Sequence, residues 1–301
     1  STINRNSVML IIDCQLCTAC GLCEGSCAFG AIAVTGDCAV VNESCTLCGA
    51  CVDNCPVGAL RIETAEKSVQ ADLADYRGIL VFAEYRHGTI APVAYELLGI
   101  GRKLADQRGV QLAAVVLGGV VSNCASDLIA AGADLVLVAE HPELEQFRED
   151  IYAGILEKVI REQKPEVVLA GATAIGRSVI PYVATAINAG LTADCTRLEI
   201  READGMLLQT RPAFGGNIMA TIECPQTRPQ MATVRPKVMA PAEPDPTRQG
   251  QVVRVELPDA LLQSRLQVVE NVVNTEDQVN IQEVETLVAG GRGLDSAKGF
   301  A

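Results

Sequence analysis

Short apolar runs alternate with amphipathic segments through the middle of this 301-residue chain. Runs bounded by turn residues predict buried strands, and apolar residues at spacings of three and four predict the helices between them. The strands are predicted at 78–85, 110–119, 133–140 and 165–173, and the helices at 89–109, 122–132, 142–164 and 175–190. Strands that alternate with helices in this way predict an α/β fold with a parallel, doubly wound sheet.

The pattern changes after residue 194. From 195 to 239, short β-type runs are separated by Asp-Gly, Gly-Gly and proline, which predicts a β-rich extension that closes the sheet. The Pro-rich stretch 240–250 is predicted to be a linker, and 251–274 a strand that leads into an extended or helical arm. Near the start of the chain, the polar stretch 63–78 is predicted to be a helical linker.

Composition narrows the class of protein. Hydrophobic residues make up 49% of the chain but aromatic residues only 3%, so the core must be aliphatic, which suits buried parallel strands. The formal charge of −13 argues against binding of nucleic acid or of anionic lipid. No apolar run reaches membrane-spanning length and the first residues lack a signal-peptide pattern, so we expect a cytoplasmic protein with no membrane insertion.

Ten of the thirteen cysteines lie before residue 56. Without a secretory signal they are read as metal ligands and not as disulfides. They form two C-x2-C-x2-C-x3-C runs, "CTACGLCEGSC" (17–27) and "CTLCGACVDNC" (45–55). The sequence around the first run is echoed around the second, which indicates a duplicated half-domain. So small a unit needs metal binding to supply folding energy.

This spacing is typical of two 4Fe–4S clusters, in which the fourth cysteine of each run ligates the other cluster. Gly21 and Gly49, each directly after a cysteine, permit close backbone approach to the sulfurs. Zinc sites usually have two separated C-x2-C pairs, so the zinc alternative is disfavoured. The predicted ligands are Cys17, Cys20, Cys23 and Cys55 for the first cluster, and Cys45, Cys48, Cys51 and Cys27 for the second.

The first run departs from the second at two points. Ala28 stands where Pro56 follows the second run, and Cys14 adds another C-x2-C spacing, so that Cys14 is an alternative ligand to a neighbour. We expect Cys14 and Cys38 to be spare buried thiols. The scattered cysteines are expected to be core residues: Cys124, Cys195 and Cys224.

Two Gly-rich stretches are candidate cofactor loops. "GATAIGRS" (171–178) is one residue type from a phosphate-binding loop, with Arg177 where a lysine is required, so a tight strand-to-helix turn is favoured. "AGGRGL" (289–294) combines a flexible backbone with a fixed cation, which suits a pyrophosphate or an electron-rich flavin. His87 and His141 fall in predicted loops without partners. The sequence shows no set of residues for acid–base or nucleophilic catalysis, so one-electron transfer is the chemistry that we expect of this chain.

From about residue 78 to its end, the chain resembles the alpha subunit of electron-transfer flavoproteins. The resemblance rests on "VLAGATAIGRSVIPYVATAINAGLTADCTRLEI", "RPAFGGNIMATIECPQTRPQMATVRP" and "VAGGRGL". The cysteine-rich head resembles the ferredoxin-like domain fused to alpha subunits of anaerobic, electron-bifurcating complexes. The implied fold is a Rossmann-like domain I behind a bacterial ferredoxin-like α+β domain.

The resemblance also implies cofactors and partners. Family alpha subunits pair with a beta subunit and carry FAD in a mobile C-terminal domain, and bifurcating members hold a second FAD in the beta subunit. There NADH delivers two electrons, one of which goes to ferredoxin and the other to a flavin-dependent dehydrogenase of the acyl-CoA or lactate type. The motif Gly290, Gly291, Arg292 and Gly293 would contact the alpha-subunit flavin, with Arg292 favouring its anionic semiquinone. The nucleotide itself is expected on the beta side.

The predicted division is a ferredoxin-like domain (1–65), a linker (66–77), domain I (78–255), an arm (256–288) and the first residues of the FAD-binding domain II (289–301), the remainder of which is expected beyond residue 301. The predicted function is electron transfer within a bifurcating complex, by a subunit that is not catalytic alone. The alternatives are a non-bifurcating carrier to a dehydrogenase, a nucleotide-binding enzyme with a redox-sensing head, and an adaptor whose clusters are only structural.

Overall fold

The computed structural model describes residues 2–5, 8–64, 73–86, 88–271, 286–294 and 296–300. Most of the predicted linker, His87 and part of the predicted arm therefore lie outside the described residues. The cysteine-rich head and the α/β unit are described in turn, each by itself.

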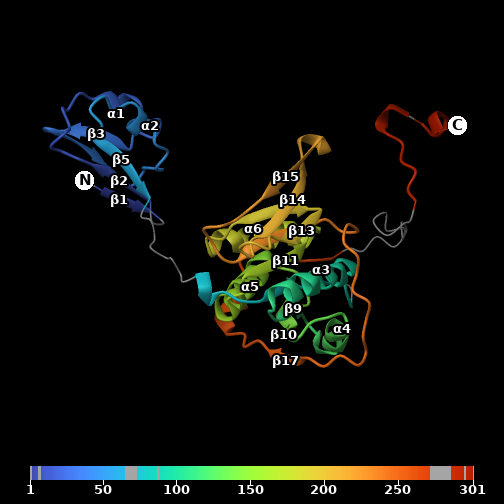
Figure 1. The fold of residues 1–301 in the computed structure, drawn as a ribbon. Coiled ribbons are helices and arrows are strands. Elements are labelled where there is room, and N and C mark those ends of the chain that lie inside the picture. Colours follow the sequence, from blue (N-terminus) through green and yellow to red (C-terminus); the bar gives the residue numbers. More distant parts are fainter. Residues whose placement is uncertain are drawn as a thin grey trace.

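The head combines a three-stranded antiparallel sheet, in the order β1-β2-β5, with a β-hairpin and two one-turn helices (Figure 1). Each helix follows the second cysteine of one run, so the duplicated sequence gives duplicated structure. The strands are β1 (Thr2–Arg5), β2 (Val8–Ile12), β3 (Ile32–Thr35), β4 (Cys38–Val41) and β5 (Leu60–Thr64), and the helices are α1 (Leu22–Gly25) and α2 (Ala50–Asp53). Because β5 continues to Thr64, the helical linker predicted from residue 63 starts too early.

Glycine is required where each head helix begins. Gly21 precedes α1 with φ of 75° and Gly49 precedes α2 with φ of 84°, both in the left-handed region that L side chains avoid. This turn reverses the chain between the second and third cysteine of each run. The same backbone conformation thus shapes both halves of the head.

The α/β unit is built on seven parallel strands in the order β12-β16-β11-β6-β9-β10-β17 (Figure 1). The central strands are buried along their whole length, as continuous apolar runs in a parallel sheet should be. The strands are β6 (Ile79–Phe82), β9 (Leu112–Gly118), β10 (Leu135–Glu140), β11 (Val167–Gly171), β12 (Leu191–Cys195), β16 (Gln230–Val234) and β17 (Gln251–Arg254).

Helices cover both faces of this sheet. On one face α3 (Pro92–Arg108) and α4 (Ala125–Ala130) pack on alternate strand residues, and on the other face α5 (Glu149–Gln163) and α6 (Ala174–Ala186) pack on the rest. The predicted doubly wound α/β fold is confirmed. Among the described helices, none is both long and apolar enough to cross a bilayer.

The β-rich extension is organised differently from the prediction. β12 and β16 extend the parallel sheet and do not close it, while β13 (Arg197–Ile200), β14 (Leu207–Ala213) and β15 (Ile218–Ile222) form a separate antiparallel sheet. The helix predicted at 142–164 is also shorter. A 3-10 turn occupies Pro142–Leu144, Arg148 is extended, and α5 begins at Glu149.

The Pro-rich stretch 240–250 packs against helices and does not hang free as a linker. The backbone N–H of Ala242 donates to the Tyr95 carbonyl at 3.2 Å, and that of Asp245 donates to the Ala130 carbonyl at 2.8 Å. These bonds fasten the segment across α3 and α4. The segment leads into β17, which pairs with β10 at the edge of the sheet.

The remaining described elements are short. A small hairpin of β7 (Tyr85–Arg86) and β8 (Thr89–Ile90) connects β6 to α3. Single 3-10 turns lie at Leu73–Asp75, Ser122–Cys124, Phe214–Gly216, Asp259–Leu261, Arg292–Leu294 and Ala297–Phe300.

Candidate metal centres and the switch-point loop

The head contains a first hollow lined by four sulfurs. Three come from the first run and one from the end of the second run, and Val34, Val57 and Leu60 supply apolar wall. The sulfurs belong to Cys17, Cys20, Cys23 and Cys55. These are the four side chains that the spacing assigns to one cluster.

A second hollow has the reciprocal composition. It is lined by three cysteines of the second run and the last cysteine of the first, with Leu10, Phe29 and Ile62 in its wall. The sulfurs belong to Cys45, Cys48, Cys51 and Cys27. The structure thus brings together the two predicted sets of four, and that they ligate iron remains a prediction.

Backbone N–H groups point at the exchanged sulfur of each hollow. The N–H of Ala31 donates to Cys27 Sγ at 3.3 Å, and that of Ala59 donates to Cys55 Sγ at 3.3 Å. The bond from Ala31 lowers the pKa of Cys27. Burial opposes charge on Cys55, but N–H groups that include those of Val57 and Ala59 outweigh it and lower its pKa. Both sulfurs are therefore prepared to be thiolates, the form that binds metal.

The third cysteines of the two runs are neighbours. Burial raises the pKa of Cys23 and of Cys51, and the charges of Cys45, Cys23 and Cys27 raise that of Cys51 further. The helices that carry these two cysteines, α1 and α2, contact each other, so the two hollows are adjacent. A cationic centre in each hollow would be needed to keep these buried sulfurs ionised.

Each hollow offers the ligand set of one 4Fe–4S cluster. Four cysteine sulfurs line each of them, and such a cluster takes four cysteine thiolates from the protein.

The Gly-rich loop at 171–178 forms the turn between β11 and α6. The hydroxyl of Thr173 caps α6 by accepting from the Gly176 N–H at 3.0 Å. A Cβ on Gly176 would lie 1.9 Å from the Gly171 carbonyl oxygen, so glycine is required for close packing of helix on strand. Arg177 pairs with Asp194 at 3.2 Å. These contacts make the stretch a strand-to-helix turn, the reading that the sequence favours.

A buried carboxylate lies beside this turn. The strand order reverses between β6 and β11, and ligands of doubly wound sheets bind outside the carboxyl ends of such strands. Here Glu84, only 2% exposed, follows β6 and accepts a hydrogen bond from the Thr173 hydroxyl. Its other oxygen lies 3.6 Å from Arg86. A carboxyl group thus already stands where a phosphate would meet the N-terminus of α6.

Two comparisons with protein families decide the classification. Residues 79–260, which span the seven-stranded sheet, match the electron transfer flavoprotein domain, and residues 39–61, which include the second cysteine run, match the 4Fe-4S binding domain.

The chain belongs to the electron transfer flavoprotein family.

Relatives in this family point to an alpha-type subunit. The chain is 47% identical over 226 residues to an electron transfer flavoprotein subunit alpha of Thermoanaerobacterium thermosaccharolyticum, a match that covers 75% of this chain and 68% of the relative. It is 41% identical over 272 residues to subunit LctC of the lactate dehydrogenase (NAD(+),ferredoxin) of Acetobacterium woodii, covering 90% of this chain and 64% of the relative. A third relative, 42% identical over 250 residues, is the acryloyl-CoA reductase electron transfer subunit beta of Anaerotignum propionicum, with 74% and 68% covered.

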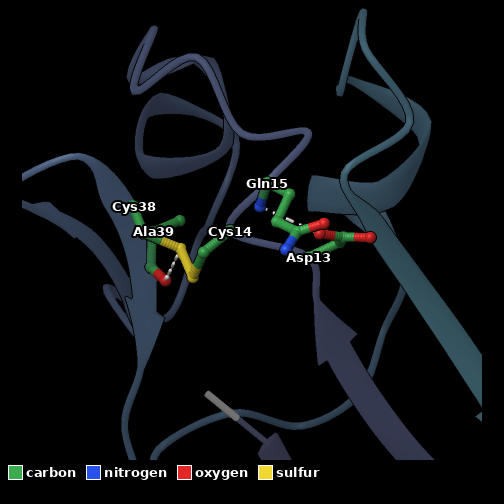
Figure 2. The surroundings of a disulfide bond; sticks show 5 residues. All are labelled: Asp13, Cys14, Gln15, Cys38 and Ala39. Carbon is green, nitrogen blue, oxygen red and sulfur yellow. Dashed lines mark hydrogen bonds between the residues drawn. A yellow bond between two sulfur atoms is a disulfide. The ribbon is translucent and has the colours of Figure 1, made fainter.

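Sequence reasoning was wrong about two cysteines of this flavoprotein subunit. Cys14 and Cys38 are not spare buried thiols but form a disulfide with a Cα–Cα distance of 5.3 Å (Figure 2). Cys14 is exposed and Cys38 half-buried. Nothing in the local spacing signals this pair, because it depends on how the β3–β4 hairpin lies against the segment before the first run. In this state Cys14 is not available as an alternative ligand.

Of the expectations for the remaining cysteines and for His141, some are confirmed and others are wrong. Cys124 and Cys195 are buried as predicted, whereas Cys224 is only half-buried. His141 was expected to lack partners, but its Nδ1 accepts from the Glu143 N–H at 3.1 Å and caps a 3-10 turn.

The flavin motif of the family stays a prediction. Gly290, Gly291, Arg292 and Gly293 are exposed, and the last two start a 3-10 turn. Within the described residues Arg292 forms no ion pair, and a Cβ on Gly291 or Gly293 would meet open space. Nothing in the described structure places these residues against a flavin.

The buried Glu84 predicts a pH effect on stability. Burial raises its pKa above the ordinary value, so the stability that comes from protonating it is complete at low pH and is lost as pH rises through the folded-state pKa. Relative to Glu84→Gln, the wild type is therefore expected to gain stability as pH falls from 7.5 to 5. Urea unfolding followed by circular dichroism measures this difference. Glu162→Gln, at an exposed position of α5, is the control and should follow the wild type.

Proposed function

We propose that this chain is the electron-transfer subunit of a flavin-based electron-bifurcating complex. In this role it passes electrons among an NADH-reduced flavin on a beta subunit, a ferredoxin and a partner flavin dehydrogenase. The chain does no chemistry alone. Its sulfur sets hold two 4Fe–4S clusters, and the FAD of the alpha subunit belongs to a domain that begins near residue 289.

The observation that carries this proposal is the pair of adjacent four-sulfur hollows on an electron transfer flavoprotein unit. Bound clusters would supply two one-electron relays. The contact between α1 and α2, which carry Cys23 and Cys51, supports a short path between them. Two neighbouring relays that share interlocked ligands form a wire suited to carry single electrons.

Each part of the head has a separate task in this proposal. The eight cysteines hold the iron, and the exchanged fourth ligands, Cys27 and Cys55, tie the two halves together. The N–H groups of Ala31 and Ala59 stabilise negative charge on those two sulfurs. Such bonds to cluster sulfur raise the reduction potential. Each hollow has the same kind of backbone N–H bond to its exchanged sulfur, and this similarity supports two centres that serve one electron-transfer route.

The LctC relative favours the bifurcating version over a simple carrier. Its match covers 90% of this chain, so it extends well into the head, and its name includes both NAD(+) and ferredoxin. The two candidate partners are dehydrogenases of the lactate type and of the acyl-CoA type, and the acryloyl-CoA reductase relative supports the second. Glu84 at the switch point, together with Arg177 held by Asp194, speaks against the alternative of a nucleotide-hydrolysing enzyme.

The complex isolated anaerobically on a tag attached to this chain provides the test. We expect a beta subunit and flavin to copurify, and NADH to reduce added ferredoxin only when an oxidised acceptor of the dehydrogenase, an enoyl-CoA or a 2-oxo acid, is also present. Ferredoxin reduction is followed by its visible absorbance. Reduction of the acceptor without any reduction of ferredoxin would identify the non-bifurcating carrier.

A Cys51→Ala variant of the same complex tests whether the clusters lie on the route. We expect ferredoxin reduction to fall at least about tenfold, because removal of one relay lengthens the electron path. Acceptor reduction by NADH through the flavins should be affected less. Unchanged ferredoxin reduction in a complex that has lost half its iron would reject the wire and leave the clusters a structural role.

A further inference from the structure

We propose that the Cys14–Cys38 disulfide is a third redox centre of the head, a disulfide/dithiol couple that exchanges electrons with the two iron–sulfur clusters. This inference rests on the proposed function, because it requires those clusters to be present. It assigns a two-electron site to a domain whose other centres carry one electron each.

The disulfide is tied to the first hollow through Cys14, which precedes Cys17 by three residues. Cys14 sits in a turn closed by the bond from the Cys17 N–H to the Asp13 carbonyl at 3.0 Å, so it is one turn away from a sulfur of that hollow. Cys38 begins β4 and pairs with Thr35 of β3, next to Val34, which forms part of the wall of the same hollow. Because side chains alternate along a strand, Cys38 and Val34 lie on opposite faces of the hairpin, so the link to the hollow runs through Cys14.

The surroundings keep the two cysteines close together in both oxidation states. Asp13 is held by the bond from its N–H to the Ala59 carbonyl at 2.8 Å, and Cys38 is held in the β3–β4 hairpin. The two sulfurs therefore stay within reach of each other after the bond between them breaks. Cys38 Sγ lies 3.4 Å from the carbonyl oxygen of Ala39, which is ready to accept from the thiol formed on reduction (Figure 2).

Exposure makes this disulfide chemically accessible. Cys14 faces solvent, so water can deliver protons and an external dithiol can reach the sulfur. Buried structural disulfides resist reduction, whereas exposed ones are the labile and regulatory members of the class. The position of Cys14 within one turn of Cys17, a predicted cluster ligand, adds an internal source of electrons.

The reaction balances with the centres named. The S–S bond accepts two electrons, one from each reduced cluster, and two protons from water, and it is replaced by two S–H groups. Both clusters are reoxidised by one electron each. The reverse reaction returns two electrons to the clusters when an acceptor draws them away. The two electrons that the disulfide accepts therefore equal the two that the clusters release, one from each.

Electron counting on the full-length chain, reconstituted anaerobically with iron and sulfide and then oxidised mildly with oxidised glutathione, tests the proposal. We expect coulometric reduction to consume about two electrons per chain more in the wild type than in Cys14→Ser/Cys38→Ser, because the clusters and any bound FAD take the same number in both and only the wild type has the disulfide. Both clusters of the double variant should still be visible by EPR. The control Cys224→Ser, at a half-buried position of the α/β unit, should consume the same number as the wild type.

Alkylation gives a second, independent readout on the wild type. After stoichiometric reduction and quenching with iodoacetamide, mass spectrometry should find Cys14 and Cys38 alkylated, and before reduction it should find them joined. An equal electron count in the wild type and in Cys14→Ser/Cys38→Ser, with both clusters reduced and the disulfide intact, would overturn the inference while leaving the proposed function in place. A chain that takes up no iron and gives no EPR signal would overturn both.

Discussion

Replacing Cys27 by alanine is expected to remove the second cluster and to leave the first, although Cys27 belongs to the first cysteine run. The reason is its position in the hollow lined by Cys45, Cys48 and Cys51. Likewise, Cys55→Ala should remove the first cluster, because Cys55 lines the hollow of the first run. Each variant is expected to lower the iron content from about eight to about four atoms per chain.

EPR spectra of the reduced proteins check this exchange of ligands. The spectrum of Cys27→Ala should match that of Cys51→Ala, and the spectrum of Cys55→Ala should match that of Cys23→Ala. Cys224→Ala, outside the head, should keep all the iron. If Cys27→Ala instead resembled Cys23→Ala, each run would bind its own cluster and the structural grouping of the sulfurs would be the wrong guide to ligation.

The grouping of these eight sulfurs could be predicted from sequence because it depends on local spacing. Two-residue spacers and a left-handed glycine curl three sulfurs of a run around one hollow, and the duplicated halves exchange the fourth. The order of helices and strands in the α/β unit was predictable for a similar reason. Buried parallel strands such as β6 and β11 need continuous apolar runs, and those runs stand out between amphipathic helices.

Features that depend on contacts between distant segments could not be predicted. The partner of Cys14 is fixed by the hairpin that carries Cys38, 24 residues away. Glu84 gives no sign in the sequence that it is buried, since its burial follows from the turn at Thr173 packing over it. The Pro-rich stretch 240–250 has the composition of a linker, and only its backbone bonds to α3 and α4 reveal that it is packed.

Two of these missed features lie where function is expected to reside: the partner of Cys14 is in the head, and Glu84 is at the switch point. At the switch point, a carboxylate and a crowded glycine occupy the positions that a nucleotide would need. In the function proposed here the α/β unit therefore serves as a scaffold, and the cysteines of the head hold the one-electron relays. The consequence is that Gly176 should matter for stability and not for phosphate binding.

Gly176→Ala is accordingly expected to destabilise the α/β unit by about 3 kcal/mol or more. The new Cβ would lie 1.9 Å from the Gly171 carbonyl oxygen and 3.1 Å from its carbon, both backbone atoms that end β11. Neither α6 nor the central strand can shift without losing packing against the sheet. Urea unfolding monitored by circular dichroism at 222 nm measures the loss, and in cells the variant should accumulate largely as insoluble protein.

Gly154→Ala is the matched control, because Gly154 is also a helical glycine, in α5. Its added Cβ would meet only the Leu261 side chain at 3.4 Å, an ordinary contact. Since alanine is the better helix former, this variant should be as stable as the wild type or more stable by about 0.5–1 kcal/mol. If Gly176→Ala were instead as stable as Gly154→Ala, the close packing of α6 on β11 would not be what requires glycine. The phosphate-loop interpretation of "GATAIGRS" would then have to be reopened, with ATP binding by the two variants as the measurement that separates the two explanations.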